Sequence, residues 1–236
     1  MFNCTWSEYK NFITRDGMNG YIYRGQENSN WKLQTTFHRE AETKNIDLPF
    51  YLNNIIPLIH QKIISEGFEV HNLNDIPNYN SFLSKLQHHG FPTPLLDWTY
   101  SPYIAAYFGI LSKNKPESKY FSIYAFDYYK WIRNNYQPID LLNTEPFVST
   151  FVPYYNNNPR LISQKSILTV TNQNDIEEYL NYMSINQNSK YLYKINILRS
   201  EINTIQTDLN YMGIKENILF PKFDDICKMM KNNLFS

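Results

Sequence analysis

Apolar residues recur at helical spacing in several segments of the chain. Between residues 47 and 66 they fall three and four positions apart, a spacing that predicts one long helix. A polar stretch over residues 72–80 reads as a loop. Further helices are predicted over residues 7–14, 81–87, 101–108, 128–134, 176–183, 200–211 and 222–232.

Other segments favour extended backbone. Residues 21–26 are rich in aromatic and β-branched side chains, which pack well on a pleated sheet. Strands are likewise predicted at residues 120–127, 150–153, 162–170 and 191–195, with a turn at Asn156–Pro159. No linker or repeat divides the chain, so we expect one α+β domain with a central mixed or split β-sheet flanked by helices. A helical extension over residues 1–20 would precede a domain over residues 21–236.

The composition excludes several classes of function. Basic and acidic residues balance at 22 each, so we expect no strong nucleic-acid binding and no attraction to an anionic membrane. The chain has no apolar run of the roughly 20 residues that span a bilayer. Cys4 and Cys227 stand far apart without ligand spacing, which predicts neither a disulfide framework nor a metal site. We therefore expect a cytoplasmic protein without a metal.

The segment Gln87–Thr99 concentrates the candidate chemistry. It combines turn residues with an amide, two imidazoles, a carboxylate, an indole and hydroxyl groups beside an apolar run. Asp97 can orient an imidazole such as that of His89, although on a strand adjacent histidines point to opposite faces. Asp97 can equally brace the helix that follows, where Ser101 as N-cap also suits an anionic ligand.

Two further segments carry polar groups suited to a ligand. Arg24 ends a predicted strand and can offer its guanidinium to a phosphate, while Gly25 lets a ligand approach the backbone and Gln26 follows. A surface ion pair beside an ordinary turn is the structural alternative. Arg160 and Gln164 lie on a later predicted strand; Gln164 can form hydrogen bonds but cannot act as a general base. The chain has no P-loop, nucleophile elbow, dinucleotide fingerprint or zinc-protease motif.

In this order, the motifs resemble the FRG domain, a bacterial and phage family named for its aromatic-Arg-Gly motif. The resemblance spans about residues 20–230. It is carried by the segments Tyr23–Gln26, Trp31–Leu33, Gln87–Thr93, Leu95–Thr99 and Ala105–Phe108, by Arg39, and by Arg160 with Gln164.

The layout of this family is similar to that of the ADP-ribosyltransferases. The resemblance implies that NAD is the substrate and that Arg24 holds its pyrophosphate, with Gly25, Gln26 and Arg160 near the nucleotide. Thr99 and Ser101 would occupy the strand that leads into the small-residue helix, and Trp98, Tyr107 or Phe108 would stack on nicotinamide. Gln164 stands where these enzymes carry a catalytic Glu, so Asp97 or His89 would have to assist.

Two functions remain open at this point. One is transfer of ADP-ribose to an unknown macromolecular acceptor, or consumption of NAD by an effector or toxin in conflict between bacteria and phage. The other is a non-catalytic module that binds a nucleotide or a protein, which the missing carboxylate favours. A nucleic-acid-acting enzyme is a third, weaker candidate because the net charge is zero.

Overall fold

The computed structural model describes residues 1–220 except 16, 69, 112–117 and 153–161. The helix predicted over residues 222–232, the Asn156–Pro159 turn and Arg160 lie outside the described residues. Within them the chain is α+β, as predicted, with a seven-stranded mixed sheet in the order β1-β7-β4-β2-β3-β6-β5. The strands are β1 (Phe2–Cys4), β2 (Tyr21–Gln26), β3 (Leu95–Thr99), β4 (Tyr120–Asp127), β5 (Val148–Phe151), β6 (Ser166–Thr171) and β7 (Leu192–Leu198).

The helices follow their caps. The principal ones are α1 (Trp6–Ile13), α2 (Thr36–Lys44), α3 (Leu48–Phe50), α4 (Ile56–Ser65), α5 (Ile76–His88), α6 (Pro102–Ile110), α7 (Tyr128–Asn134), α9 (Ile176–Asn186), α10 (Ile202–Tyr211) and α11 (Glu216–Leu219). A π-helical turn, Tyr51–Ile55, joins α3 to α4, so the long predicted helix is present with one irregular turn. A 3-10 turn, Arg199–Glu201, precedes α10.

Several boundaries differ from the sequence-based expectations. The loop expected over residues 72–80 is wrong in its second half, because Asp75 caps α5 and Pro77 occupies its first turn. The strand expected from Ile162 begins only at Ser166, after a helical turn. Neither β1 nor α2 was expected. β1 pairs in parallel with β7, so residues 1–20 contribute a strand as well as the predicted helix to the fold.

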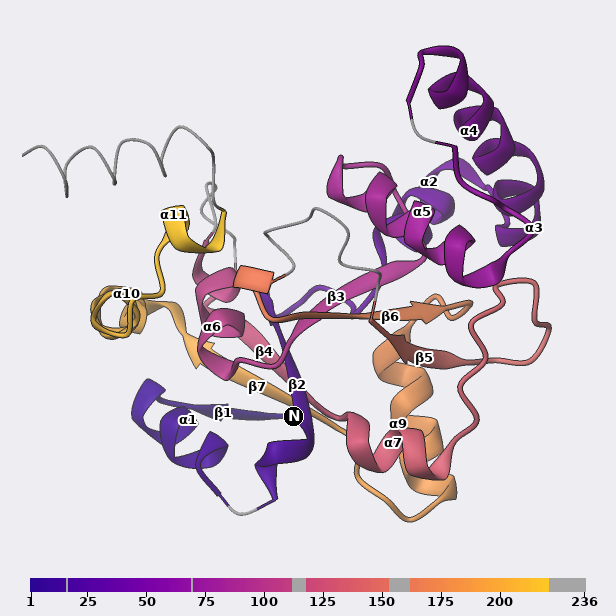
Figure 1. Cartoon of the computed structure of the whole chain (residues 1–236). Coiled ribbons are helices and arrows are strands. Elements are labelled where there is room, and N and C mark those ends of the chain that lie inside the picture. Colours follow the sequence, from indigo (N-terminus) through magenta and orange to yellow (C-terminus); the bar gives the residue numbers. More distant parts are fainter. Residues whose placement is uncertain (16, 69, 112–117, 153–161, 221–236) are drawn as a thin grey trace, which may run out of the picture.

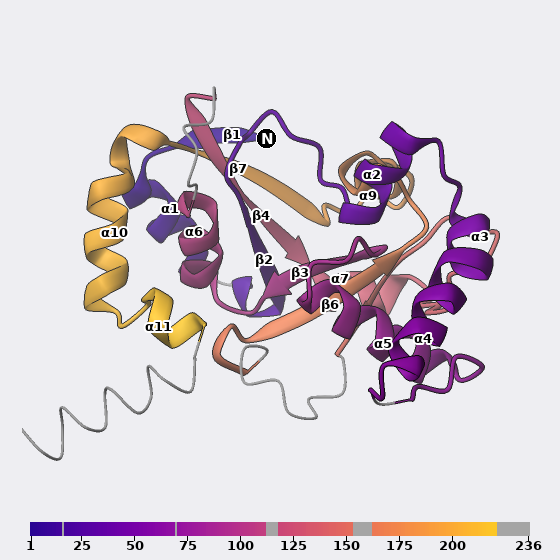
Figure 2. The same cartoon turned by 90° about the horizontal axis from the view of Figure 1, so that it is seen from above.

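Three apolar clusters cover the sheet. Helices α1, α6 and α10 pack on β2, β4 and β7 through one cluster, and α7 and α9 pack through a second that includes Trp98 and Trp131. Helices α2 to α5 pack on β3, β5 and β6 through a third. Both views place α10 and α11 on the opposite side of the molecule from α3 and α4 (Figures 1 and 2).

No helix in the described part of the chain has both the length and the apolar character needed to cross a bilayer.

Candidate functional site

The sheet is held together weakly at its centre. Strands β2 and β3 meet in a single antiparallel bridge, Tyr23 with Thr99, whereas β2 pairs with β4 along its whole length. Beyond that bridge β2 and β3 separate, and a cleft of about 940 Å³ opens there. Its walls come from β2, β3, α2, α5 and α6 and from the loop after β2. Pockets of roughly 300–1,000 Å³ are typical of small-molecule sites.

Arg24 bridges the separated strands. Its Nη1 donates a hydrogen bond of 2.7 Å to the main-chain carbonyl of Asp97, which has no β2 partner in the sheet register. Its buried Nε has no hydrogen-bond partner within the described residues. Burial lowers the pKa of Arg24, and the nearby Arg39 lowers it further while Asp97 raises it. Arg24 therefore has a structural role, and its side chain also lines the cleft.

Asp97 is one of three carboxylates that line the cleft, together with Glu27 and Glu42. By surface area its side chain is open to solvent, yet the surrounding protein desolvates the carboxyl and raises its pKa. Arg24, a hydrogen bond from Gln87 and the charge of His88 act in the opposite direction. The Gln87 Nε2 donates to Asp97 Oδ2 at 2.7 Å, and the Thr93 hydroxyl donates to Gln87 Oε1.

The turn after α5 explains this arrangement. Gly90 has φ +85°, the left-handed conformation that ends many helices, and Phe91 N–H bonds back to the Leu86 carbonyl. The chain therefore reverses within a few residues and returns Thr93 to Gln87. The two histidines end the helix instead of lying on a strand: His88 is its last residue and His89 its C-cap. His88 lines the cleft, whereas His89 is exposed outside it.

Gly25 serves the fold. A Cβ at this position would lie 1.9 Å from the Ala105 carbonyl oxygen and 2.5 Å from the Gly109 nitrogen. The backbone that approaches Gly25 is therefore that of α6, where the sequence suggested a ligand. Close packing also explains the small residues of α6, since Ala105, Ala106 and Gly109 are all buried against the sheet.

Gln26 also has a structural partner. Its Nε2 donates to the Trp31 carbonyl at 2.8 Å, which closes the loop of residues 27–32. Trp31, which sequence reasoning did not select as a site residue, lines the cleft with its side chain 52% exposed. The loop thus holds an open indole at the cleft, a position suited to stacking on a planar ligand.

Thr99 and Gln164 line the cleft, but their polar groups are engaged within the chain. The Thr99 hydroxyl donates to the Gln164 carbonyl at 2.7 Å and accepts from the Ser101 N–H at 3.1 Å. The Gln164 Nε2 donates to the Leu219 carbonyl at 3.0 Å, which ties this segment to α11. Ser101 caps α6 through Ile104 N–H and lies outside the cleft.

The predicted aromatic residues fall in different places. Phe108 lines the cleft and packs edge-on against Phe220, with ring centroids 6.0 Å apart. Trp98 also lines it but is 2% exposed, and its indole N–H donates to the Thr169 hydroxyl in the core. Tyr107 packs against the core cluster of α6 and does not line the cleft. Trp31 and Phe108 are therefore the rings placed to stack on a ligand.

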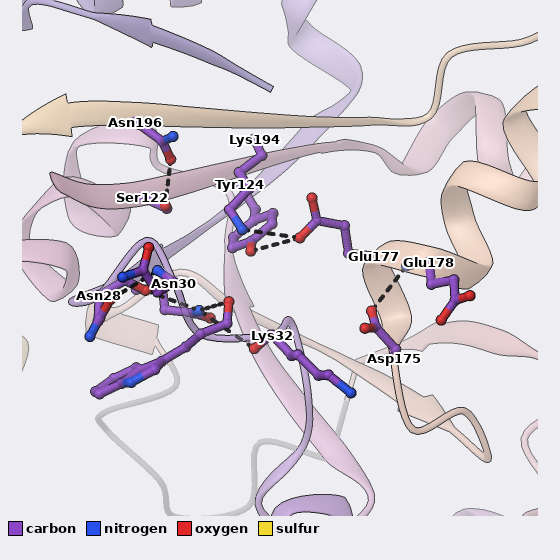
Figure 3. Close-up of polar contacts among 12 residues, drawn as sticks. Asn28, Asn30, Lys32, Ser122, Tyr124, Asp175, Glu177, Glu178, Lys194 and Asn196 are labelled. Atoms are coloured by element: carbon purple, nitrogen blue, oxygen red, sulfur yellow. Dashed lines mark hydrogen bonds and ion pairs between the residues drawn. The ribbon is translucent and has the colours of Figure 1, made fainter. Parts of the chain in front are cut away.

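A second, more open groove lies between residues 30–32 of the loop after β2 and α9. Glu177 accepts hydrogen bonds from the Tyr124 hydroxyl at 3.0 Å and from Lys194 at 3.2 Å (Figure 3). Asp175 is also engaged, because it caps α9. These carboxylates support the fold beside β4 and β7, and Asp97 is the aspartate that faces the cleft.

The structure brings together Arg24, Gly25, Gln26, Asp97, Trp98, Thr99, Phe108 and Gln164 from the predicted set. It leaves out His89, Ser101 and Tyr107. Sequence reasoning missed the contribution of Gln87 and Thr93. The available signal was their place in one short segment with Asp97, but the hydrogen bonds depend on the turn at Gly90. Within the described residues no cluster of three or more metal-ligating side chains is present.

Comparison with known protein families gives one assignment. Residues 19–118 match the FRG domain family, a segment that begins two residues before β2 and runs past the end of α6. It therefore includes Arg24, Gln87, Thr93 and Asp97, while Gln164 lies beyond it. Neither the search of curated proteins nor the search of solved structures found a match.

Proposed function

Since residues 19–118 belong to the FRG domain family, we propose that their cleft binds NAD and that the protein breaks the bond between nicotinamide and ribose. The electron pair of that bond leaves with nicotinamide, whose ring nitrogen becomes neutral. The ribose C1′ then bonds to an acceptor, either a macromolecule or water. The proton lost by the acceptor passes to Asp97 or to solvent.

The pairing of Arg24 with Asp97 in one cleft carries this proposal. Arg24 lines the cleft, and its guanidinium would hold the pyrophosphate oxygens there. The carboxylate of Asp97 would stabilise the positive charge that develops on the ribose as nicotinamide departs. Trp31 and Phe108 supply rings for the two planar ends of a dinucleotide.

The contacts of the other predicted site residues favour Asp97 as the group that acts on the ribose. Of the other carboxylates that line the cleft, Glu42 accepts a hydrogen bond from the Asn174 amide. Gln164 has no charge, and its amide donates to the Leu219 carbonyl. Thr99 uses its hydroxyl to hold the Gln164 segment, and His89 lies outside the cleft. We therefore assign to Asp97 the role that the ADP-ribosyltransferases give to a glutamate, and to Gln164 the role of fixing α11.

Release of nicotinamide from NAD labelled in that ring tests the proposal. We expect release by the wild-type protein, with cell lysate as the source of acceptors, and a loss of about 100-fold in both Asp97→Asn and Arg24→Lys. Asp47→Asn is a matched control, because asparagine also caps a helix and Asp47 lies outside the cleft. Arg133→Lys, at an exposed position, is the control for the arginine.

A non-catalytic nucleotide-binding module is the second candidate, favoured by the neutral side chain at Gln164 and its bond to Leu219. It predicts that NAD raises the thermal midpoint of the wild-type protein without any release of nicotinamide. If NAD neither stabilises the protein nor releases nicotinamide, both candidates are refuted. A role in conflict between bacteria and phage stays a prediction from the family resemblance.

A further inference from the structure

Gln87 lies between a buried hydroxyl and the carboxylate of Asp97. Its Nε2 donates to Asp97 Oδ2 at 2.7 Å, and its Oε1 accepts from the hydroxyl of Thr93. A carboxylate can only accept, so the NH₂ end of the amide must face Asp97 and the oxygen must face Thr93. Thr93 is fully buried, and its own main-chain N–H bonds to Thr36. The chain from Thr93 to Asp97 thus has one consistent direction.

We propose that Gln87 is a positioning residue, which fixes the direction of the Asp97 carboxylate and favours its ionised form, with Thr93 locking the amide. The use of this arrangement in catalysis rests on the proposed function; the arrangement itself rests on the contacts. Because Gln87 holds Oδ2, the other carboxylate oxygen, Oδ1, is the one that would face a bound ribose.

Each charged group around Asp97 has a different relation to it. Arg24 on β2 approaches from the opposite strand but gives its Nη1 hydrogen bond to the main-chain carbonyl. His88 on α5 acts on Asp97 through its charge, and Arg39 on α2 acts on Arg24. Gln87 therefore supplies a direct hydrogen bond to the carboxylate, which opposes the desolvation that would favour the neutral acid.

Direct titration of Asp97 tests this inference without any ligand. In protein labelled with ¹³C at the aspartate carboxyls, the Asp97 signal is assigned by its loss in Asp97→Asn. Loss of a hydrogen bond to the ionised form raises a pKa, so we expect Gln87→Leu to raise that of Asp97 by about one unit. Gln87→Glu should raise it further, because two carboxylates would compete for one site. Thr93→Val should give a smaller rise, since it frees the amide without removing it.

Two variants in the same cleft serve as controls. Gln164→Leu removes an amide that bonds to Leu219, and Thr43→Val removes a hydroxyl that bonds to the Arg39 carbonyl. Both should leave the Asp97 titration unchanged. If Gln87→Leu fails to fold, the pKa of Asp97 in Thr93→Val tests the inference.

An Asp97 titration that is the same in the folded Gln87 and Thr93 variants as in the wild type overturns the inference. A failure to release nicotinamide bears on the proposed function instead, because the titration contains no NAD. The two failures are therefore distinguishable.

Discussion

Gly25→Ala separates two explanations of the glycine in the aromatic-Arg-Gly motif. If the glycine admits a ligand, a methyl group should weaken binding and leave the free energy of unfolding unchanged. If it admits α6, the methyl group should destabilise the protein whether or not a ligand is present. The contacts support the second explanation, because the added Cβ would lie 1.9 Å from the Ala105 carbonyl oxygen and 2.5 Å from the Gly109 nitrogen.

The magnitude follows from those distances. Ordinary contact begins at 3.4 Å, so α6 would have to retreat from β2 by about 1.5 Å. Both obstructing atoms belong to the backbone and cannot rotate away. Overpacking a core costs about 1–3 kcal/mol, and we expect a value at the upper end, about 3 kcal/mol. A chain of this size loses roughly 2 °C of thermal midpoint per kcal/mol, so the midpoint should fall by about 6 °C.

Thermal unfolding followed by circular dichroism measures the effect, and Gly90→Ala is the control. Gly90 has φ +85° but open space around it, so alanine there meets only the left-handed strain of about 1–2 kcal/mol. We expect Gly25→Ala to have the lower midpoint of the two. A Gly25→Ala protein as stable as the wild type would refute the packing argument and restore the ligand explanation.

Three further predictions concern stability and reactivity. Burial lowers the pKa of His38 to about 4, so the unfolded chain takes up its proton first and stability is lost as pH falls from about 6.5 toward 4. The loss should be about 3 kcal/mol by urea unfolding, and an equal loss in His38→Gln would assign it to other groups. Burial, with Glu8 and Glu201, raises the pKa of the Cys4 thiol to about 12, so iodoacetamide should label Cys4 slowly at pH 7.5 and quickly after unfolding; equal rates would contradict this. Gln164→Ala removes the hydrogen bond to the Leu219 carbonyl and should speed amide exchange across α11 but not α10; unchanged exchange would show that Gln164 does not hold α11.

Local sequence signals were sufficient to predict elements whose caps and side-chain preferences lie within a few residues of each other. Ser101 followed by Pro102 predicted the start of α6, and the aromatic and β-branched residues of 21–26 predicted β2 to the residue. The signals failed where pairing is distant in sequence. β1 has three residues and exists because β7, far along the chain, offers it an edge. The polar residues near Asn80 suggested a loop, yet the amide of Asn80 is buried and donates to the Ile139 carbonyl.

The candidate site shows the same difference between what local signals predict and what depends on distant contacts. The residues of the cleft were recognisable by type, because a guanidinium and a carboxylate beside buried strands are costly unless they have partners. Their roles could not be predicted, because a role depends on which polar groups already form hydrogen bonds within the folded chain. The sequence does not tell whether Thr99 and Gln26 face a ligand or hold a loop. The structure gives both of them main-chain partners.

The early end of the β2–β3 pairing decides which side chains remain for chemistry. Had the two strands stayed paired, the Asp97 carbonyl would have accepted a main-chain hydrogen bond from β2, and Arg24 would have had no part in joining them. Because their pairing is confined to Tyr23 and Thr99, Arg24 must reach across the gap to satisfy that carbonyl. The cleft opens at the same gap, so the side chain that joins the two strands also lines the cleft. Arg24→Lys should therefore cost both stability and NAD binding, since a single ammonium cannot donate to the Asp97 carbonyl with the planar geometry of a guanidinium and also hold a pyrophosphate. Stability and NAD binding both equal to those of the wild type would show that neither role depends on the guanidinium.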